Sequence, residues 1–150
     1  MDIDFMKRAV TLARMSAIEG EVPVGAVVVK NGEIVGEGRN RRETGKNALY
    51  HAEIEAIDNA CKRLGGWRLW QCDLYVTLEP CPMCAGAIIN ARIKKVVFGA
   101  SDKKAGSFGS VIDFNDIPYN HKPEIISGVM EDECSALLSD FFKKLRAKRK

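Results

Sequence analysis

The stretch DLYVTLEPCPMCAGAIINA, residues 73–91, decides the expected fold because it joins a strand to a helix. Asp73 to Leu78 is rich in β-branched and aromatic side chains, as strands are. Pro82 suits the first position of a helix, and Met83 to Ala91 continues it. A strand that runs straight into a helix is typical of an α/β protein.

Two cysteines stand at the start of this expected helix, and a His-Ala-Glu tripeptide begins 30 residues before the first of them. Cys81 and Cys84 are three apart, so one helical turn places both sulfurs on the same face. With the imidazole of His51 they form the mixed sulfur and nitrogen donor set that zinc prefers. Glu53 lies two residues from His51 and does not share its helix face, so we expect it to approach a zinc-bound water from the side.

Three protein ligands leave the fourth position of a tetrahedral zinc open, which distinguishes a catalytic site from a structural one. Water in that position can have its pKa lowered to about 7. Two alternatives remain open. His121 or Cys72 could close a structural zinc site, or Cys81 and Cys84 could be a redox pair with His51 as a helix-cap residue.

The length of the chain suits one domain over all 150 residues, 1–150. The acidic start, residues 1–4, does not resemble a signal peptide, and no stretch approaches the about 18 apolar residues of a membrane span. We therefore expect a soluble, cytoplasmic protein without membrane contact. There, Cys61, Cys72 and Cys134 are expected to be buried free thiols.

Basic residues are unevenly distributed, although the net charge is only +3. Residues 141–150 hold six basic side chains and no acidic one. A second cluster precedes the histidine and consists of Arg39, Arg41, Arg42 and Lys46. Such runs are often solvated surface, but two clusters, one of them next to a candidate site, favour a polyanionic substrate.

Helices and strands are expected to alternate along the chain. Apolar periodicity predicts helices over residues 3–19, 51–64, 83–91 and 131–146, and strands over 22–29, 33–38, 73–78, 95–100 and 124–129. Asn31-Gly32 is a hairpin turn, and residues 39–50 form a loop. Residues 101–122 carry no clear pattern. The alternation predicts a mixed sheet with helices packed on it.

The His-Ala-Glu tripeptide and residues 77–87 together resemble the zinc-dependent cytidine and deoxycytidylate deaminase superfamily. Over nearly its whole length the chain is similar to one family within it, the bacterial tRNA-specific adenosine deaminases. The matching segments are residues 21–26, 67–69, 74–77, 96–100, 120–121 and 138–142. This resemblance implies a three-layer α/β/α fold around a mixed five-stranded sheet with helices on both faces, a homodimer, one Zn²⁺ per subunit, and conversion of the wobble adenosine of a tRNA anticodon loop to inosine.

The resemblance also implies a role for each motif residue. His51, Cys81 and Cys84 hold zinc. Glu53 is the catalytic residue: it shuttles protons while zinc-bound hydroxide attacks C6 of the flipped adenine, first to the ring and then to the departing ammonia.

Further residues are implied to contact the tRNA anticodon stem-loop. Asn40 matches an asparagine that holds the base, and its amide can donate and accept at once. Asp102 matches a position that contacts a ribose 2′-hydroxyl. Ala52 and Pro80 are placed at the substrate as well. The alternatives are a loop asparagine that caps a turn and an ordinary turn aspartate.

Two further features concern the ends of the substrate site. The C-terminal helix resembles a segment that borders bound RNA, with Lys143, Lys144 and Arg146 as phosphate contacts. The family often has Pro-Thr-Ala before the histidine, whereas this chain has Ala48-Leu49-Tyr50. This departure affects the pocket and the exact substrate. Tyr50 is expected to be a core residue, with a stacking platform as the alternative.

Two other functions stay open at this point. The chain could be a zinc deaminase of a free nucleobase, nucleoside or nucleotide of the guanine or cytosine type. It could also be a non-catalytic RNA-binding module with a structural zinc. A tRNA adenosine deaminase would share its zinc chemistry with the first alternative and its RNA binding with the second.

Overall fold

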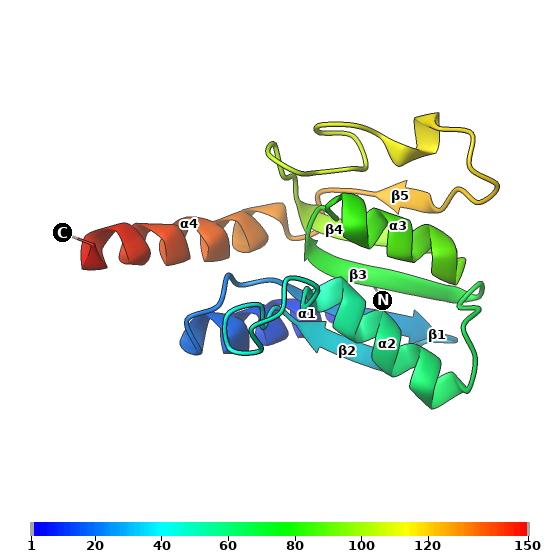
Figure 1. The fold of residues 1–150 in the computed structure, drawn as a ribbon, viewed down its shortest axis with the longest axis horizontal. Coiled ribbons are helices and arrows are strands. Elements are labelled where there is room, and N and C mark those ends of the chain that lie inside the picture. The colour runs from blue at the N-terminus through cyan, green and yellow to red at the C-terminus, as the bar shows by residue number, and fades with distance from the viewer. Residues whose placement is uncertain (1, 150) are drawn as a thin grey trace.

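The computed structural model describes residues 2–149 and contains a five-stranded sheet flanked by helices (Figure 1). The helices are α1 (Asp2–Ile18), α2 (Ala52–Leu64), α3 (Pro82–Ala91) and α4 (Glu131–Lys148), with a short 3₁₀ turn, η1 (Phe114–Asp116). The strands are β1 (Gly25–Lys30), β2 (Glu33–Arg39), β3 (Cys72–Leu78), β4 (Lys95–Ala100) and β5 (Glu124–Ile126).

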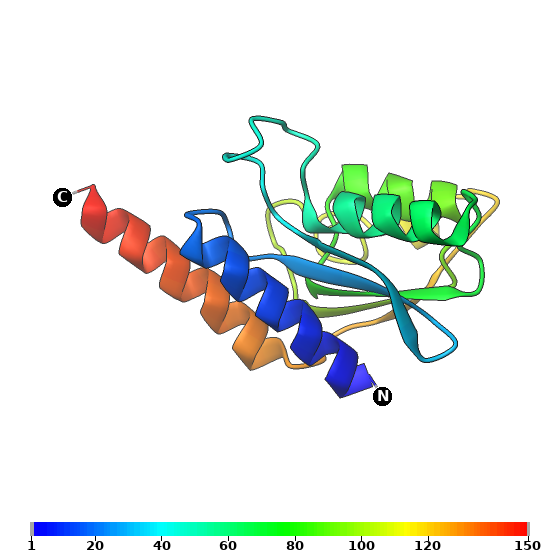
Figure 2. The same ribbon diagram turned by 90° about the horizontal axis from the view of Figure 1, so that it is seen from below.

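The sheet is mixed, as predicted, and its strand order is β2-β1-β3-β4-β5. β1 runs antiparallel to both β2 and β3, whereas β3, β4 and β5 are parallel to one another. Figure 2 shows α2 and α3 on one face and α1 and α4 on the other. Each face has its own apolar cluster. The three-layer α/β/α expectation is therefore confirmed.

Two glycines of β2 allow α2 to lie unusually close to the sheet. A Cβ on Gly38 would come within 2.1 Å of the Ala52 carbonyl oxygen, and one on Gly36 within 2.3 Å of the Ala56 oxygen. Ala52 and Ala56 are themselves fully buried. Small residues on both elements thus set the position of α2, whose N-terminus follows His51.

Most element boundaries differ from the sequence expectation by one to three residues, and three of these differences affect the description of the fold or the site. β1 begins at Gly25 and not at Val22, because Pro23 has no N–H to donate to a neighbouring strand. β5 ends at Ile126, before Gly128, which adopts a left-handed conformation (φ 83°). His51 is the extended residue before α2 and not its first helical residue.

The cysteines are unpaired, as expected. Cys72 and Cys134 are buried, whereas Cys61 is only partly buried, so the expectation of burial was wrong for that residue. Burial raises the pKa of the Cys134 thiol to about 11, which leaves it protonated and inert at neutral pH. In the part of the chain that the structure describes, no helix is long and apolar enough to cross a membrane.

Candidate active site

The N-termini of α2 and α3 meet at one end of the sheet (Figure 1). His51 precedes α2, and Cys81 precedes α3, just after the end of β3. Cys84 lies in the first turn of α3, where Pro82 opens the helix. Helix N-termini favour negative charge, so this end of the molecule suits thiolates.

The three expected ligands lie together. His51 Nδ1 is 3.6 Å from Cys81 Sγ and 3.5 Å from Cys84 Sγ, and all three ligand atoms lie within 4.8 Å of one another. Tetrahedral zinc with ordinary bond lengths separates nitrogen and sulfur ligands by about 3.6 Å. The donor set and its spacing therefore fit one zinc ion.

Neither expected alternative ligand joins this group among residues 2–149. Cys72 lies at the first position of β3, at the opposite end of that strand from Cys81. The Nε2 atom of His121 lies 2.7 Å from the Ile93 carbonyl oxygen and is engaged there. Within the described chain the cluster offers three protein ligands, which is the number typical of catalytic zinc sites.

The two thiols differ in their readiness to ionise. A hydrogen bond from Cys84, together with the neighbouring His51, lowers the pKa of Cys81 to about 4. The same hydrogen bond, together with burial, raises the pKa of Cys84. Before a cation binds, one thiolate is thus already present at neutral pH and the second proton stays on Cys84. A divalent cation would displace that proton.

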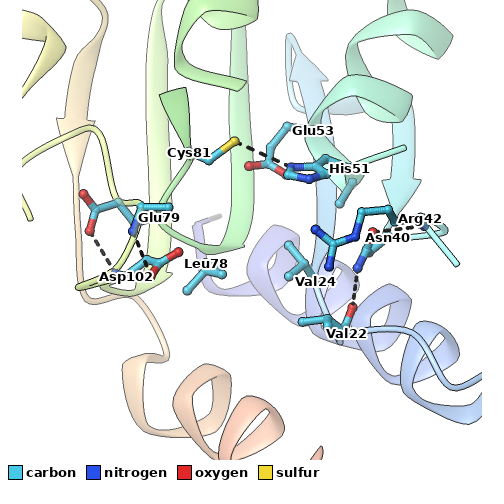
Figure 3. Close-up of a pocket in the computed structure, with 12 residues that line it drawn as sticks. Val22, Val24, Asn40, Arg42, His51, Glu53, Leu78, Glu79, Cys81 and Asp102 are labelled. Carbon is cyan, nitrogen blue, oxygen red and sulfur yellow. Dashed lines mark hydrogen bonds between the residues drawn. The ribbon is translucent and has the colours of Figure 1, made fainter. Parts of the chain in front are cut away.

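Glu53 lies in the first turn of α2 and is only 4% exposed. Burial raises the pKa of its carboxyl group to about 7, with the nearby Cys81 thiolate adding to the effect. Figure 3 shows its carboxyl group beside His51 and Cys81, although it is not one of the clustered ligands. A carboxyl group with a pKa near 7 can both accept and return a proton at neutral pH.

A cavity of about 210 Å³ opens onto this group of residues. Part of its lining lies next to β1 and β2, and another part next to the ends of β3 and β4. The lining residues are Val22, Val24, Asn40, Arg42, His51, Ala52, Glu53, Leu78, Glu79, Cys81, Asp102 and Ala105. Five of these residues are apolar and seven carry polar or ionisable groups, so the cavity can both pack against a small ligand and hydrogen-bond to it.

Of the four expected substrate contacts, Asn40, Ala52 and Asp102 line the cavity and Pro80 does not. Pro80 is buried, and its carbonyl oxygen accepts a hydrogen bond from the Ser107 N–H (2.9 Å). Pro80 therefore helps to hold the wall and does not itself form it.

The Asn40 amide is buried and partly engaged. Its Nδ2 donates to the Val22 carbonyl (3.2 Å), and its Oδ1 accepts from the Arg42 N–H (3.3 Å). An amide has two N–H donors and two acceptor lone pairs, so one of each is free for a ligand. Asn40 thus organises the loop, as its turn-capping alternative predicts, and its remaining donor and acceptor are compatible with the expected contact to a base.

Asp102 also has a turn role. Its Oδ1 accepts from the backbone N–H groups of Lys104 (3.0 Å) and Ala105 (3.3 Å). The second carboxylate oxygen takes no part in these turn hydrogen bonds, and Asp102 lines the cavity. A turn role and a ligand-binding role for Asp102 are therefore compatible in this geometry.

Glu79 is a site residue that the sequence reasoning missed. Its buried carboxylate accepts from the backbone N–H groups of Asp102 (3.0 Å), Phe108 (3.1 Å) and Ser110 (3.2 Å), and from the Ser110 hydroxyl. A Cβ on Gly106 would lie 2.3 Å from the Glu79 Cδ. Four donors fill the acceptor capacity of a carboxylate, so Glu79 holds the loop that carries Asp102. An acidic residue between a buried strand and a metal ligand was the available signal.

Glu21 does the same for the loop over residues 39–50 on the other side of the cavity. It is fully buried and accepts from the backbone N–H groups of Glu43 (3.0 Å) and Thr44 (2.6 Å). Burial opposes ionisation, but these hydrogen bonds keep the pKa of Glu21 below its ordinary value. Both walls of the cavity are therefore held by buried carboxylates.

The expectation that Tyr50 is a core residue was wrong, because Tyr50 is 44% exposed. One side of its ring packs against Gly45, where a Cβ would lie 2.3 Å from the ring. The Tyr50 carbonyl oxygen accepts from the Arg41 N–H (3.1 Å). These interactions close the loop on itself, and the ring stays at its surface, outside the cavity lining.

The three expected phosphate contacts at the C-terminus are exposed on α4 but lie outside the cavity lining. Figure 1 shows the C-terminal half of α4 projecting away from the sheet. Lys143, Lys144 and Arg146 lie on this projecting part. Any contact that they make with a ligand is separate from the cavity itself.

Comparison with known proteins finds deaminases over most of the chain. A model of the MafB19-like deaminase family matches residues 2–146. Over 147 residues, 97% of this chain and 91% of its counterpart, the chain is 51% identical to the tRNA-specific adenosine deaminase of Bacillus subtilis (strain 168). A structure from a study of A-to-I editing by tRNA:A34 deaminases at the wobble position of transfer RNA matches with TM-score 0.88 and 43% identity, over 90% of this chain and 99% of that one. A guanine deaminase from Bacillus subtilis matches with TM-score 0.65 and 45% identity, over 80% and 76%.

Proposed function

Because the chain belongs to the MafB19-like deaminase family and to the family of tRNA-specific adenosine deaminases, we propose that it converts the wobble adenosine of a tRNA anticodon loop to inosine by hydrolytic deamination. One observation carries the proposal: a three-ligand cluster and a buried carboxyl group with a pKa near 7 open onto one cavity. The observed donor set and spacing support zinc as the cofactor, one ion per subunit.

His51, Cys81 and Cys84 would hold the zinc ion. When bound, zinc supplies a Lewis acid that makes water nucleophilic at neutral pH. Glu53 takes up the proton that this activation releases, delivers it to the adenine ring, and then carries a proton to the departing ammonia. Its burial supports this role, because burial raises the pKa of the carboxyl group and so favours uptake of a proton.

The cavity walls position the base and its sugar. Asn40 offers one free donor and one free acceptor to the edge of the adenine, and Asp102 offers an acceptor to a ribose 2′-hydroxyl. Ala52 forms part of the apolar floor. A flipped base is read in this way, by polar groups at its edge and apolar contacts at its faces.

Deamination of free guanine is the second candidate, and it is supported by the 45% identity to a guanine deaminase. The tRNA substrate is better supported, because the match to a tRNA:A34 deaminase has the higher TM-score, 0.88 against 0.65. Asn40 does not separate the two, since an amide can pair with either purine.

Turnover with matched substrates tests the proposal. The purified protein is incubated with an anticodon stem-loop RNA that has adenosine at the wobble position, and separately with free adenosine and free guanine. Inosine is expected in the RNA, with little or no ammonia released from the free compounds. Ammonia release from guanine alone would replace the tRNA proposal by the second candidate. RNA binding without turnover of any substrate would favour a non-catalytic module.

We also propose that residues 1–150 form one deaminase domain and that the protein acts as a homodimer in the cytoplasm. The family match over residues 2–146 supports the first point. For the second, large apolar side chains remain exposed at and just after the C-terminal end of α2, and a partner subunit would cover such residues; they include Leu64, Trp67 and Trp70. Size-exclusion chromatography coupled to light scattering is expected to give twice the mass of one chain.

A further inference from the structure

The four basic residues that precede His51 are not equivalent in the structure. Arg39 pairs with Glu19 (2.7 Å), and Arg41 pairs with Glu55 (3.1 Å). Both charges are therefore largely neutralised within the protein. The Arg39 side chain is only 11% exposed, and the Arg41 guanidinium is held against Glu55 of α2.

Arg42 differs from Arg39 and Arg41 in two respects, and the fourth member of the cluster, Lys46, does not line the cavity. Arg42 makes no ion pair or side-chain hydrogen bond with any residue in the described range, 2–149, and it is the one arginine that lines the cavity. Figure 3 shows its guanidinium group reaching from the loop toward the space between His51 and Val24. The positive charge of Arg42 therefore lies at the wall of the cavity.

The backbone of Arg42 is fixed, so its side chain starts from a defined place. The Arg42 N–H donates to Asn40 Oδ1 (3.3 Å), and its carbonyl oxygen accepts from the Asn47 N–H (3.1 Å). The next two residues are held by the buried Glu21. Asn40, the residue proposed to hold the base, therefore also sets the position of Arg42.

We propose that Arg42 binds a backbone phosphate of the RNA strand next to the flipped nucleotide, and that it thereby favours a polynucleotide over a free base. This inference rests on the proposed tRNA substrate. An unpaired guanidinium offers planar N–H donors that match two phosphate oxygens at once. A base inserted between Asn40 and the ligand cluster leaves its own phosphodiester links on the solvent side of the cavity, and Arg42 both lines the cavity and is exposed to solvent.

Arg42→Gln tests the proposal, with Arg41→Gln as the matched control from the same loop. With an anticodon stem-loop RNA, Arg42→Gln is expected to raise KM about tenfold with little change in kcat, because a charge-assisted hydrogen bond is removed. The slope of log affinity against log salt should fall by about 1. Arg41→Gln should stay within about twofold of the unmodified protein. Arg42→Lys should keep the salt slope, since the charge remains.

Neutral methylphosphonate links, placed one at a time on either side of the target adenosine, identify the phosphate. At one of the two positions, the neutral link should raise KM of the unmodified protein by the same factor as the Arg42→Gln substitution does. The same link should not raise KM of Arg42→Gln any further. Effects that multiply at both positions would overturn the proposal, as would equal KM values for Arg42→Gln and Arg41→Gln in a protein that forms inosine in RNA. Impaired action of Arg42→Gln on adenosine monophosphate alone would assign the charge to a mononucleotide. If the unmodified protein forms no inosine in RNA, the proposed function itself fails.

Discussion

Glu53 is the residue on which the proposed chemistry depends most. Glu53→Gln keeps the shape of the side chain but cannot carry a proton. Deamination should fall by at least about 100-fold, the lower end of the range for a general acid–base group. Zinc content, measured by atomic absorption, should be unchanged because Glu53 lies outside the ligand cluster. Glu55→Gln, two residues along the same helix, is the control. Normal turnover by Glu53→Gln would remove the assigned role.

Tyr50 gives a prediction about stability. Because its ring is exposed and only leans on Gly45, Tyr50→Ala should lower the free energy of unfolding by less than about 1 kcal/mol. Leu74→Ala, at a fully buried position, should lower it by about 2–5 kcal/mol. Urea denaturation of the two variants makes the comparison. A similar loss in both would mean that Tyr50 is a core residue after all.

At the residue scale, the sequence predicted those site residues whose partners are close in the chain or belong to a short motif. His51, Cys81, Cys84 and Glu53 were expected to lie together, and the structure brings them together. Glu79 was missed because its hydrogen-bond partners lie in a loop that carries neither periodicity nor a motif. The sequence also did not show that Arg42, unlike Arg39 and Arg41, forms no ion pair within residues 2–149. Ion pairing of the other two arginines depends on Glu19 and Glu55, which lie elsewhere in the chain.

At the scale of elements, the loop over residues 101–110 depends on one carboxylate. Glu79→Gln replaces an acceptor oxygen by an NH₂ group, which must face an N–H or O–H donor, so at least one of the four hydrogen bonds is broken. Amide exchange should then accelerate at Asp102, Phe108 and Ser110, and KM for RNA should rise several-fold through Asp102.

Hydrogen exchange read by NMR is the measurement, and zinc content is the control. Glu124→Gln, at an exposed position of β5, should leave both exchange and KM unchanged. If Glu79→Gln left the exchange rates of the loop unaltered, the carboxylate would not be what holds it. If exchange accelerated but KM stayed constant, the position of Asp102 would not matter for binding.

The elements themselves were largely predictable, and their boundaries less so. Apolar periodicity placed all four long helices of the described chain, because each buries one face against the sheet. It also placed β4, which is almost entirely buried. It overextended β1, where Pro23 lacks a donor, and β5, which ends before Gly128. The close approach of α2 to Gly36 and Gly38 is a tertiary feature with no local pattern.

At the scale of the whole molecule, the basic end of α4 is separate from the cavity and should act in binding alone. Replacing Lys143, Lys144 and Arg146 together by Gln should weaken RNA binding and reduce the salt slope by up to about 3, one unit for each phosphate that is no longer neutralised. The rate at saturating RNA should not change, since no cavity residue is altered. Fluorescence anisotropy at several salt concentrations measures the first effect. An unchanged slope would mean that α4 does not meet the phosphates.

The measurement that tests the central claim most directly follows the oxygen atom that replaces the amino group. The protein is incubated with an anticodon stem-loop RNA in oxygen-18 water, and the digested nucleosides are analysed by mass spectrometry. We predict inosine at the wobble position only, with one solvent-derived oxygen at C6, and none with Glu53→Gln. The account would be contradicted if the wobble adenosine of the RNA stayed intact after incubation with the zinc-loaded protein, or if inosine formed equally at other adenosines.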